Sequence, residues 1–180
     1  MLGAPASQSS AGGTIRRALI SEMPVLAGEG LGFTLFTIKP CGINEPHVHP
    51  RASEILYVIQ GRSLRVGFVE ENTGRTIIND LQAGQVTVFP QGLLHYQQNL
   101  GCEEAQYISA FNSEDPGVQG VSRALFGLPL EGVASALNMD EANVLTTKSN
   151  IPANPAKGRI ECLKRCGIFK SDNQVVFDKL

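Results

Sequence analysis

The stretch Gly42-Ile-Asn-Glu-Pro-His-Val-His-Pro-Arg-Ala-Ser-Glu54 decides what fold and chemistry we expect of this chain. It places His47 and His49 two residues apart, with Glu54 five residues after the second histidine. Side chains two apart point to the same face of an extended segment, and the prolines flanking this pair favour extension. His95 follows later in the chain and completes a set of three imidazoles and one carboxylate. Such a set of nitrogen and oxygen donors suits a divalent transition metal.

All three histidines of the chain belong to this pattern. An isolated histidine is more often structural or exposed than a ligand, but here every imidazole is spaced with the others. We therefore predict a metal site formed by His47, His49, Glu54 and His95. The four side chains would come from separate strands of a small barrel and meet inside it.

The composition is that of a globular protein that binds neither nucleic acid nor membrane. The chain has 180 residues, 42% of them hydrophobic and 18% charged, which is enough for one domain with a sizeable core. A net charge of −2 and a pI of about 5.9 argue against a nucleic-acid partner, which would require a basic patch. No apolar run approaches the roughly 20 residues needed to cross a bilayer.

Short apolar runs separated by glycine and proline fill the first two thirds of the chain. The segment from Gly30 to Lys39 alternates apolar and polar side chains, and similar runs follow at short intervals up to Asn112. This spacing predicts about eight strands and is typical of an all-β sandwich or barrel. A jelly roll is the closed form that avoids bare edges. We predict that residues 17–117 form an all-β jelly-roll barrel.

The ends of the chain differ from this middle part. Residues 1–16 are small, polar and rich in glycine and serine, which predicts a flexible leader that lacks the features of a secretory signal peptide. Over 118–150, apolar residues three and four apart predict short helices. Each is too brief to be stable alone, so we expect them to pack on the barrel or on another subunit. Residues 151–180 form a tail with one further short helix.

Two segments resemble the sequence boxes of the cupin superfamily. The segment from Gly42 to Gly61 fits the first germin box, and the segment from Gly84 to Asn99 fits the second, at every defined position. The segments from His49 to Glu54 and from Ala110 to Gly117 resemble those of germin-like proteins in particular. The tail is similar to fungal members of the group.

The resemblance implies a cupin jelly-roll β-barrel with a short C-terminal helical appendage. It implies manganese held by His47, His49, Glu54 and His95, with iron, zinc or nickel as alternatives. Germins oxidise oxalate with dioxygen, and many germin-like proteins dismutate superoxide, so the resemblance implies an oxidoreductase acting on a small carboxylate or on superoxide. It also implies a homo-oligomer, as a dimer, a trimer or a hexamer built as a trimer of dimers, with residues 118–150 joining the subunits.

Two positions bear on the substrate. Oxalate oxidases of the family place asparagines three and thirteen residues before the first ligand histidine. Asn44 occupies the nearer position, which implies a catalytic and substrate-binding role, but Thr34 occupies the farther one. A threonine hydroxyl can donate one hydrogen bond with a shorter reach, so oxalate itself is not fixed as the substrate. A non-catalytic metal-containing cupin that binds a small molecule, and a non-oxidative isomerase or cyclase, are the alternatives.

Four cysteines bear on the compartment: Cys41, Cys102, Cys162 and Cys166. An even number fits two disulfides with three alternative pairings and favours an extracellular location, although no signal peptide is present in this chain. A cytoplasmic location is the alternative. Cys162 and Cys166 lie one helical turn apart, and we expect structural disulfides there rather than a metal site, since no other cysteine or histidine is spaced nearby as a zinc ligand.

Overall fold

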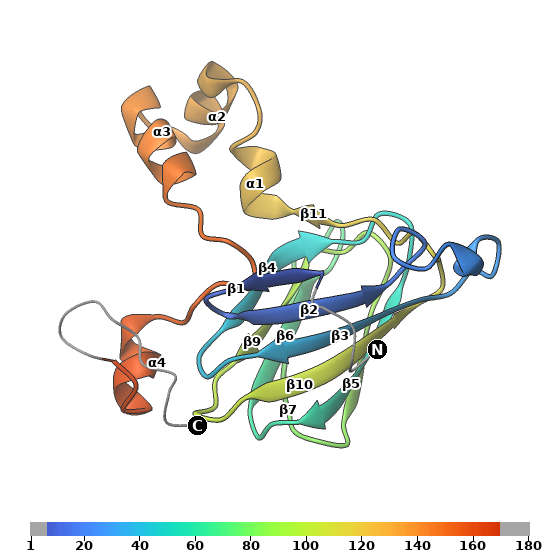
Figure 1. The fold of residues 1–180 in the computed structure, drawn as a ribbon. Helices are drawn as coiled ribbons and strands as arrows, with labels where there is room; N and C mark the ends of the chain where they lie inside the picture. Colours follow the sequence, from blue (N-terminus) through green and yellow to red (C-terminus); the bar gives the residue numbers. More distant parts are fainter. Residues whose placement is uncertain (1–6, 170–180) are drawn as a thin grey trace.

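Two antiparallel β-sheets face each other in the computed structural model, which describes residues 7–169 (Figure 1). Within this range, the six-stranded sheet has the order β1-β2-β3-β10-β5-β8, formed by Gln8–Ser10, Gly13–Ala18, Gly32–Ile38, Ala105–Phe111, Glu54–Gln60 and Val86–Phe89 respectively. The five-stranded sheet has the order β11-β4-β9-β6-β7, formed by Gln119–Gly120, Ile43–Val48, His95–Asn99, Leu64–Val69 and Thr76–Leu81. The all-β prediction is confirmed.

Apolar side chains fill part of the space between the sheets, and polar side chains fill the rest. Leu56 and Val58 of β5 belong to the same buried cluster as Leu64 and Val66 of β6. The alternation expected of half-buried strands is regular in β10, where every second residue is buried. The barrel therefore holds a rigid apolar core beside a polar site.

The structure differs from the flexible leader expected over residues 1–16. Residues 8–10 form β1 and residues 13–18 form β2, which pairs in register with β3. Ile15 explains the difference, because its side chain is only 3% exposed and belongs to the apolar core between the sheets. Residues 1–6 lie outside the described residues.

Short helices follow the barrel, as the three- and four-residue spacing predicts: α1 (Val121–Leu125), α2 (Leu130–Leu137), α3 (Glu141–Ser149) and α4 (Ile160–Arg165), with a 3-10 turn η1 (Pro24–Leu26) earlier in the chain. In Figure 1, α2 and α3 stand away from the two sheets and pack on each other. Their buried residues are only Val133 and Val144. None of the helices within residues 7–169 has the length and apolar character required to span a membrane.

Beyond α3, the tail returns to the barrel and is fastened there. Disulfides join Cys41 to Cys162 and Cys102 to Cys166, which confirms two structural disulfides and leaves no free cysteine. The backbone of Ala156 also bonds to that of Ile43 in both directions. The tail thus binds at the start of β4 and in the loop that follows β9.

Candidate metal centre

An irregularity in β4 turns Asn44 and His47 to the same side. β4 pairs with β9, and the register of this pairing shifts between Asn44 and His47, where His47 lies opposite His95. A bulge of this kind adds a residue to one strand, so side chains three positions apart both face inward. Asn44 is 3% exposed and His47 is 4% exposed as a result. Strict alternation would have placed Asn44 on the outer face.

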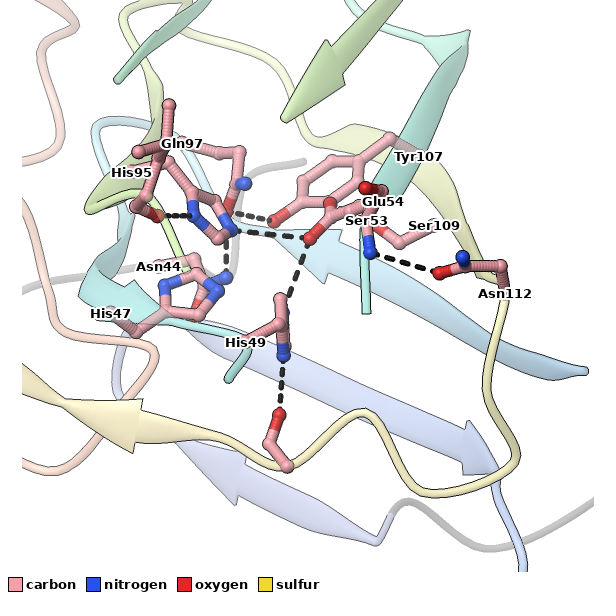
Figure 2. Close-up of polar contacts among 12 residues, drawn as sticks. Asn44, His47, His49, Ser53, Glu54, His95, Gln97, Tyr107, Ser109 and Asn112 are labelled. Atoms are coloured by element: carbon pink, nitrogen blue, oxygen red, sulfur yellow. Dashed lines mark hydrogen bonds and ion pairs between the residues drawn. The ribbon is translucent and has the colours of Figure 1, made fainter. Parts of the chain in front are cut away.

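The four predicted metal ligands come from both sheets. His47 and His95 lie on neighbouring strands of one sheet, His49 follows β4 directly, and Glu54 is the first residue of β5 in the opposite sheet. All four are buried, and the candidate ligand atoms lie within 4.8 Å of one another. Figure 2 shows the side chains pointing toward a common centre. The structure therefore brings together the complete set.

Backbone carbonyls orient the three imidazoles in the same way. The bonds join His47 Nδ1 to Glu45 O (2.7 Å), His49 Nδ1 to Gly117 O (2.5 Å) and His95 Nδ1 to Leu93 O (2.8 Å). A carbonyl only accepts, so each Nδ1 carries a proton and each Nε2 presents its lone pair to the centre unless a second proton binds there. Histidines that bind metals are commonly oriented by such bonds.

Gly117 supports His49 through its backbone conformation. Its φ of +66° lies in the left-handed region, and a Cβ at this position would come within 2.9 Å of the Arg51 guanidinium. That guanidinium is held by Asp115, at 2.8 Å from Nη2 to Oδ2. The left-handed backbone therefore favours glycine where the chain turns its carbonyl toward His49.

Glu54 supplies the single negative charge of the cluster. Burial alone would raise the pKa of its carboxyl, but close polar contacts and favourable charge interactions with His49 and His95 outweigh burial and hold the pKa below its ordinary value. Oε2 lies 3.2 Å from Nε2 of each of these two histidines. The carboxylate is therefore charged near neutral pH and attracts a cation, either a proton or a metal ion, to this point.

His47 is held in the neutral form that binds metals. Burial, together with the nearby imidazoles of His95 and His49, lowers its pKa from 6.5 to about 3. Near neutral pH, the centre thus contains a neutral imidazole and a carboxylate, and Nε2 of His49 has no hydrogen-bond partner in the described residues although Oε2 of Glu54 lies close to it. A cluster of buried lone pairs beside one negative charge fits a divalent transition metal.

A cavity of about 230 Å³ leads from the surface to this cluster. Thr34 and Asn44 both line it, together with His47 and His49. The two predicted substrate-binding residues therefore face the same space as two of the predicted ligands. The volume admits a small molecule of a few non-hydrogen atoms.

Sequence reasoning missed three polar residues around the centre: Ser109, Gln97 and Asn154. Alternation along β10 could have indicated Ser109, which lies between the buried Tyr107 and Phe111. Gln97 follows His95 by two residues and so shares its face of β9. Asn154 carried no signal, because it belongs to the tail and reaches the site only through the fold.

Two opposed sheets with three histidines and a glutamate between them define a jelly-roll barrel with a candidate metal site. The Cupin family model matches residues 2–145 of the chain. The chain belongs to the cupin family, and its relatives make it a germin-like cupin.

The relatives include Spherulin-1B of Physarum polycephalum, which is 41% identical over 163 residues, covering 90% of this chain and 65% of that protein. Probable germin-like protein subfamily 2 member 5 of Arabidopsis thaliana is 38% identical over 144 residues, covering 79% of this chain and 67% of that protein. The chain thus spans about two thirds of the length of these relatives.

Among solved structures, an oxalate oxidase is 31% identical to this chain, with a TM-score of 0.76 over 83% of this chain and 77% of that one. An oxalate oxidase in complex with the substrate analogue glycolate is equally similar. The fold therefore has counterparts among enzymes.

Proposed function

We propose that the chain is a metal-dependent oxidoreductase of the germin-like class, with manganese as its metal and a small carboxylate or superoxide as its substrate. The observation that carries the proposal is the buried convergence of three imidazole lone pairs and one carboxylate at the end of a small cavity. The likeness to oxalate oxidase, including a complex with glycolate, supports the carboxylate class.

The four side chains His47, His49, Glu54 and His95 would hold the ion. A bound manganese ion would supply one-electron redox chemistry, which iron can also supply and zinc cannot. Glu54 would offset part of the positive charge of the ion, and the carbonyl bonds at each Nδ1 keep the imidazoles in place.

Other residues prepare the space for the substrate. Phe89 stacks on His95 with ring centroids 4.5 Å apart, and Phe111 packs edge-on against His49 at 4.7 Å. These apolar walls exclude water from the ligands and stiffen them. Asn44 would donate a hydrogen bond to a bound anion, and the hydroxyl of Thr34 lies on the same cavity wall.

Assembly and location belong to the same proposal. α2 and α3 expose Leu137 and Leu145, and Leu128 just before α2 is 57% exposed. These side chains would be covered by another copy of the chain in a dimer, a trimer or a hexamer. Two disulfides are stable in an oxidising compartment, which supports an extracellular location.

Metal analysis of the protein as isolated, combined with two activity assays, tests the proposal. We expect manganese near one equivalent per chain, together with either peroxide release from oxalate or loss of superoxide. A protein that contains only zinc and is silent in both assays would contradict an oxidoreductase. Silence together with tight binding of a small carboxylate would instead support the alternative of a non-catalytic binding cupin.

A further inference from the structure

A chain of hydrogen bonds links the C-terminal tail to the interior of the barrel (Figure 2 shows its inner part). Its members are Glu45 N–H to Asn154 Oδ1 (2.8 Å), Asn154 Nδ2 to Asn44 Oδ1 (2.7 Å), Asn44 Nδ2 to Gln97 Oε1 (2.7 Å) and Tyr107 O–H to Gln97 Oε1 (3.2 Å). Three side-chain amides are thus connected in series, from a backbone group at one end to a buried phenol at the other.

The direction of every bond in this chain follows from its first member. The backbone N–H of Glu45 can only donate, so the atom of Asn154 that meets it must be the carbonyl oxygen. The other end of the Asn154 amide is then NH₂, which must meet the carbonyl oxygen of Asn44. By the same reasoning, Asn44 turns its NH₂ group to Gln97. The orientation of the Asn44 amide is therefore determined by Asn154.

The orientation of the Asn44 amide affects the site because Asn44 lines the cavity together with His47 and His49. Its Nδ2 donates one hydrogen to Gln97, and its NH₂ group also lies beside the hydroxyl of Tyr107. Gln97 is fully buried, and its Nε2 has no hydrogen-bond partner among the described residues. Among the described residues, the Gln97 amide thus has N–H groups left over, and the Asn44 amide presents its NH₂ group inward while its carbonyl oxygen is occupied by Asn154.

We propose that Asn154 is a positioning residue that makes the cavity selective for ligands with acceptor atoms, such as small carboxylates. Asn154 does this by holding the Asn44 amide with its NH₂ toward the inside of the barrel. The inference rests on the proposed function, because it assumes that the small molecule in the cavity also binds the metal. It gives the tail a role in the site, since Asn154 directly precedes Pro155 and Ala156, which bond to the barrel backbone.

A purely structural role for Asn154 makes different predictions. Asn154 also accepts a hydrogen bond at its backbone carbonyl from Gln8, so its side chain is not the only link between the tail and the barrel. If the side chain only fastened the tail, its replacement would lower stability without altering the orientation of Asn44 or the preference for anions. The test must therefore read out orientation and ligand affinity separately from stability.

The substitution Asn154→Asp keeps the shape of the side chain and its acceptor for Glu45, but it replaces the donor that meets Asn44 with an acceptor. We expect Asn44 to rotate its amide and donate to the introduced carboxylate, which turns the Asn44 carbonyl oxygen inward. In the metal-free, ¹⁵N-labelled protein, the Asn44 side-chain NH₂ signals, identified by their loss in Asn44→Ser, should move and lose their cross-peaks to Gln97. Asn79→Asp, an exposed substitution on β7 of the same charge change, should leave these signals in place.

The second readout is the affinity of the manganese-loaded protein for glycolate, measured by calorimetry. A hydrogen bond to a charged group is worth about 1.5–3 kcal/mol, so the dissociation constant should rise about tenfold or more in Asn154→Asp. Asn154→Ala separates orientation from charge, because it removes the donor without adding a carboxylate. It should also weaken glycolate binding, while the metal content stays at the wild-type level.

Unchanged Asn44 signals in Asn154→Asp, or wild-type glycolate affinity in both variants, would overturn the inference. If Asn154→Asp does not fold, the wild-type spectrum still decides, because Asn44 NH₂ protons with cross-peaks to Asn154 instead of Gln97 would contradict the stated orientation. If the wild-type protein binds no metal, the proposed function fails, whereas the spectrum of the metal-free protein continues to test Asn154.

Discussion

Ser109 Oγ donates a hydrogen bond of 2.6 Å to Oε1 of Glu54, which leaves Oε2 of the same carboxylate to face the imidazoles. The two residues lie on adjacent strands, β10 and β5, and both are buried. The hydroxyl thus occupies one carboxylate oxygen, and the other oxygen is the one that faces His49 and His95.

Ser109→Ala should weaken metal binding while the fold is retained. Oε1 of Glu54 would lose its buried donor, which costs about 1–3 kcal/mol of unfolding free energy, and loss of a partner that orients a ligand typically lowers metal affinity about 10–100-fold. Chemical denaturation and competition with a chelator measure the two effects. Ser135→Ala, at an exposed position of α2, is the matched control and should change neither. Wild-type metal affinity in Ser109→Ala would show that Glu54 does not depend on this bond.

Glu54→Gln removes the charge of the centre with little change in shape. Without the carboxylate, the three imidazoles lack their anionic partner, and we expect the metal content of the isolated protein to fall at least about tenfold. Mass spectrometry of the metal after extensive dialysis measures this. Glu71→Gln makes the same chemical change at an exposed turn and should retain full metal content. Equal metal content in both variants would exclude Glu54 as a ligand.

The stability of the metal-free protein should fall in mild acid because of His47. Its pKa is about 3 in the folded state and about 6.5 in the unfolded state, so between these values the unfolded chain binds the extra proton. Stability therefore decreases as the pH falls from 6.5 toward 3, at up to about 1.4 kcal/mol per pH unit from this group. Glu54 acts in the same direction, because the contribution of its lowered pKa is present above about pH 4.5 and is lost in stronger acid.

Urea unfolding of the metal-free protein at about pH 7, 5.5 and 4.5 checks this expectation. His47→Gln removes the titrating group and should reduce the slope, which separates His47 from the remaining acidic and basic groups. A stability that does not change across this range would mean that His47 is not held neutral by its surroundings.

Removing the Cys41–Cys162 disulfide should release part of the tail from the barrel. This disulfide closes a separation of 121 residues, and the loss of a native disulfide typically costs about 2–4 kcal/mol of unfolding free energy. The double substitution Cys41→Ser with Cys162→Ser, compared with the wild type by chemical denaturation, measures the cost. Limited proteolysis should then cut first near α4.

Gly158 approaches Cys41 so closely that a Cβ would come within 2.2 Å of its carbonyl oxygen, so Gly158→Ala should disturb the same contact.

The exposed leucines of the helical appendage predict an assembly larger than a monomer. Leu137 and Leu145 are 40% and 53% exposed, and Asp at both positions should prevent their burial against another copy. Light scattering coupled to gel filtration should give a smaller mass for Leu137→Asp with Leu145→Asp than for the wild type. Substitution of the exposed Lys148 by Glu is a control for the change in charge. A wild-type protein that is monomeric at micromolar concentration would contradict the proposal.

Local patterns predicted most of the barrel because its strands obey the period-2 rule. The strands Glu54–Gln60, Leu64–Val69 and Ala105–Phe111 lie in the region up to Asn112 where short apolar runs predict strands. The four predicted metal ligands were recognisable because donor type and spacing are local properties. The convergence of Glu54 with the histidines required the two sheets to face each other, and this was inferred from the barrel.

Features that depend on contacts distant in the sequence were not predictable. The segment of β1 and β2 looks flexible by composition, and only its pairing with β3 and the burial of Ile15 make it regular. The bulge in β4 arises from pairing with β9, so alternation alone places Asn44 on the wrong face. Asp140 precedes α3 directly, but its side chain makes no capping hydrogen bond, and the helix begins at Glu141 without it.

The candidate metal ligands and Asn154, which we propose orients Asn44, lie in different parts of the sequence. All four candidate donors lie at or before His95, so a growing chain can present them before the segment with Asn154 has been synthesised. That segment is joined to the barrel by backbone hydrogen bonds of Pro155 and Ala156, and the disulfides of Cys162 and Cys166 follow it in the chain. Under the proposed function, a metal ion would need only residues up to His95, whereas the orientation of Asn44 would also need the docked C-terminal tail.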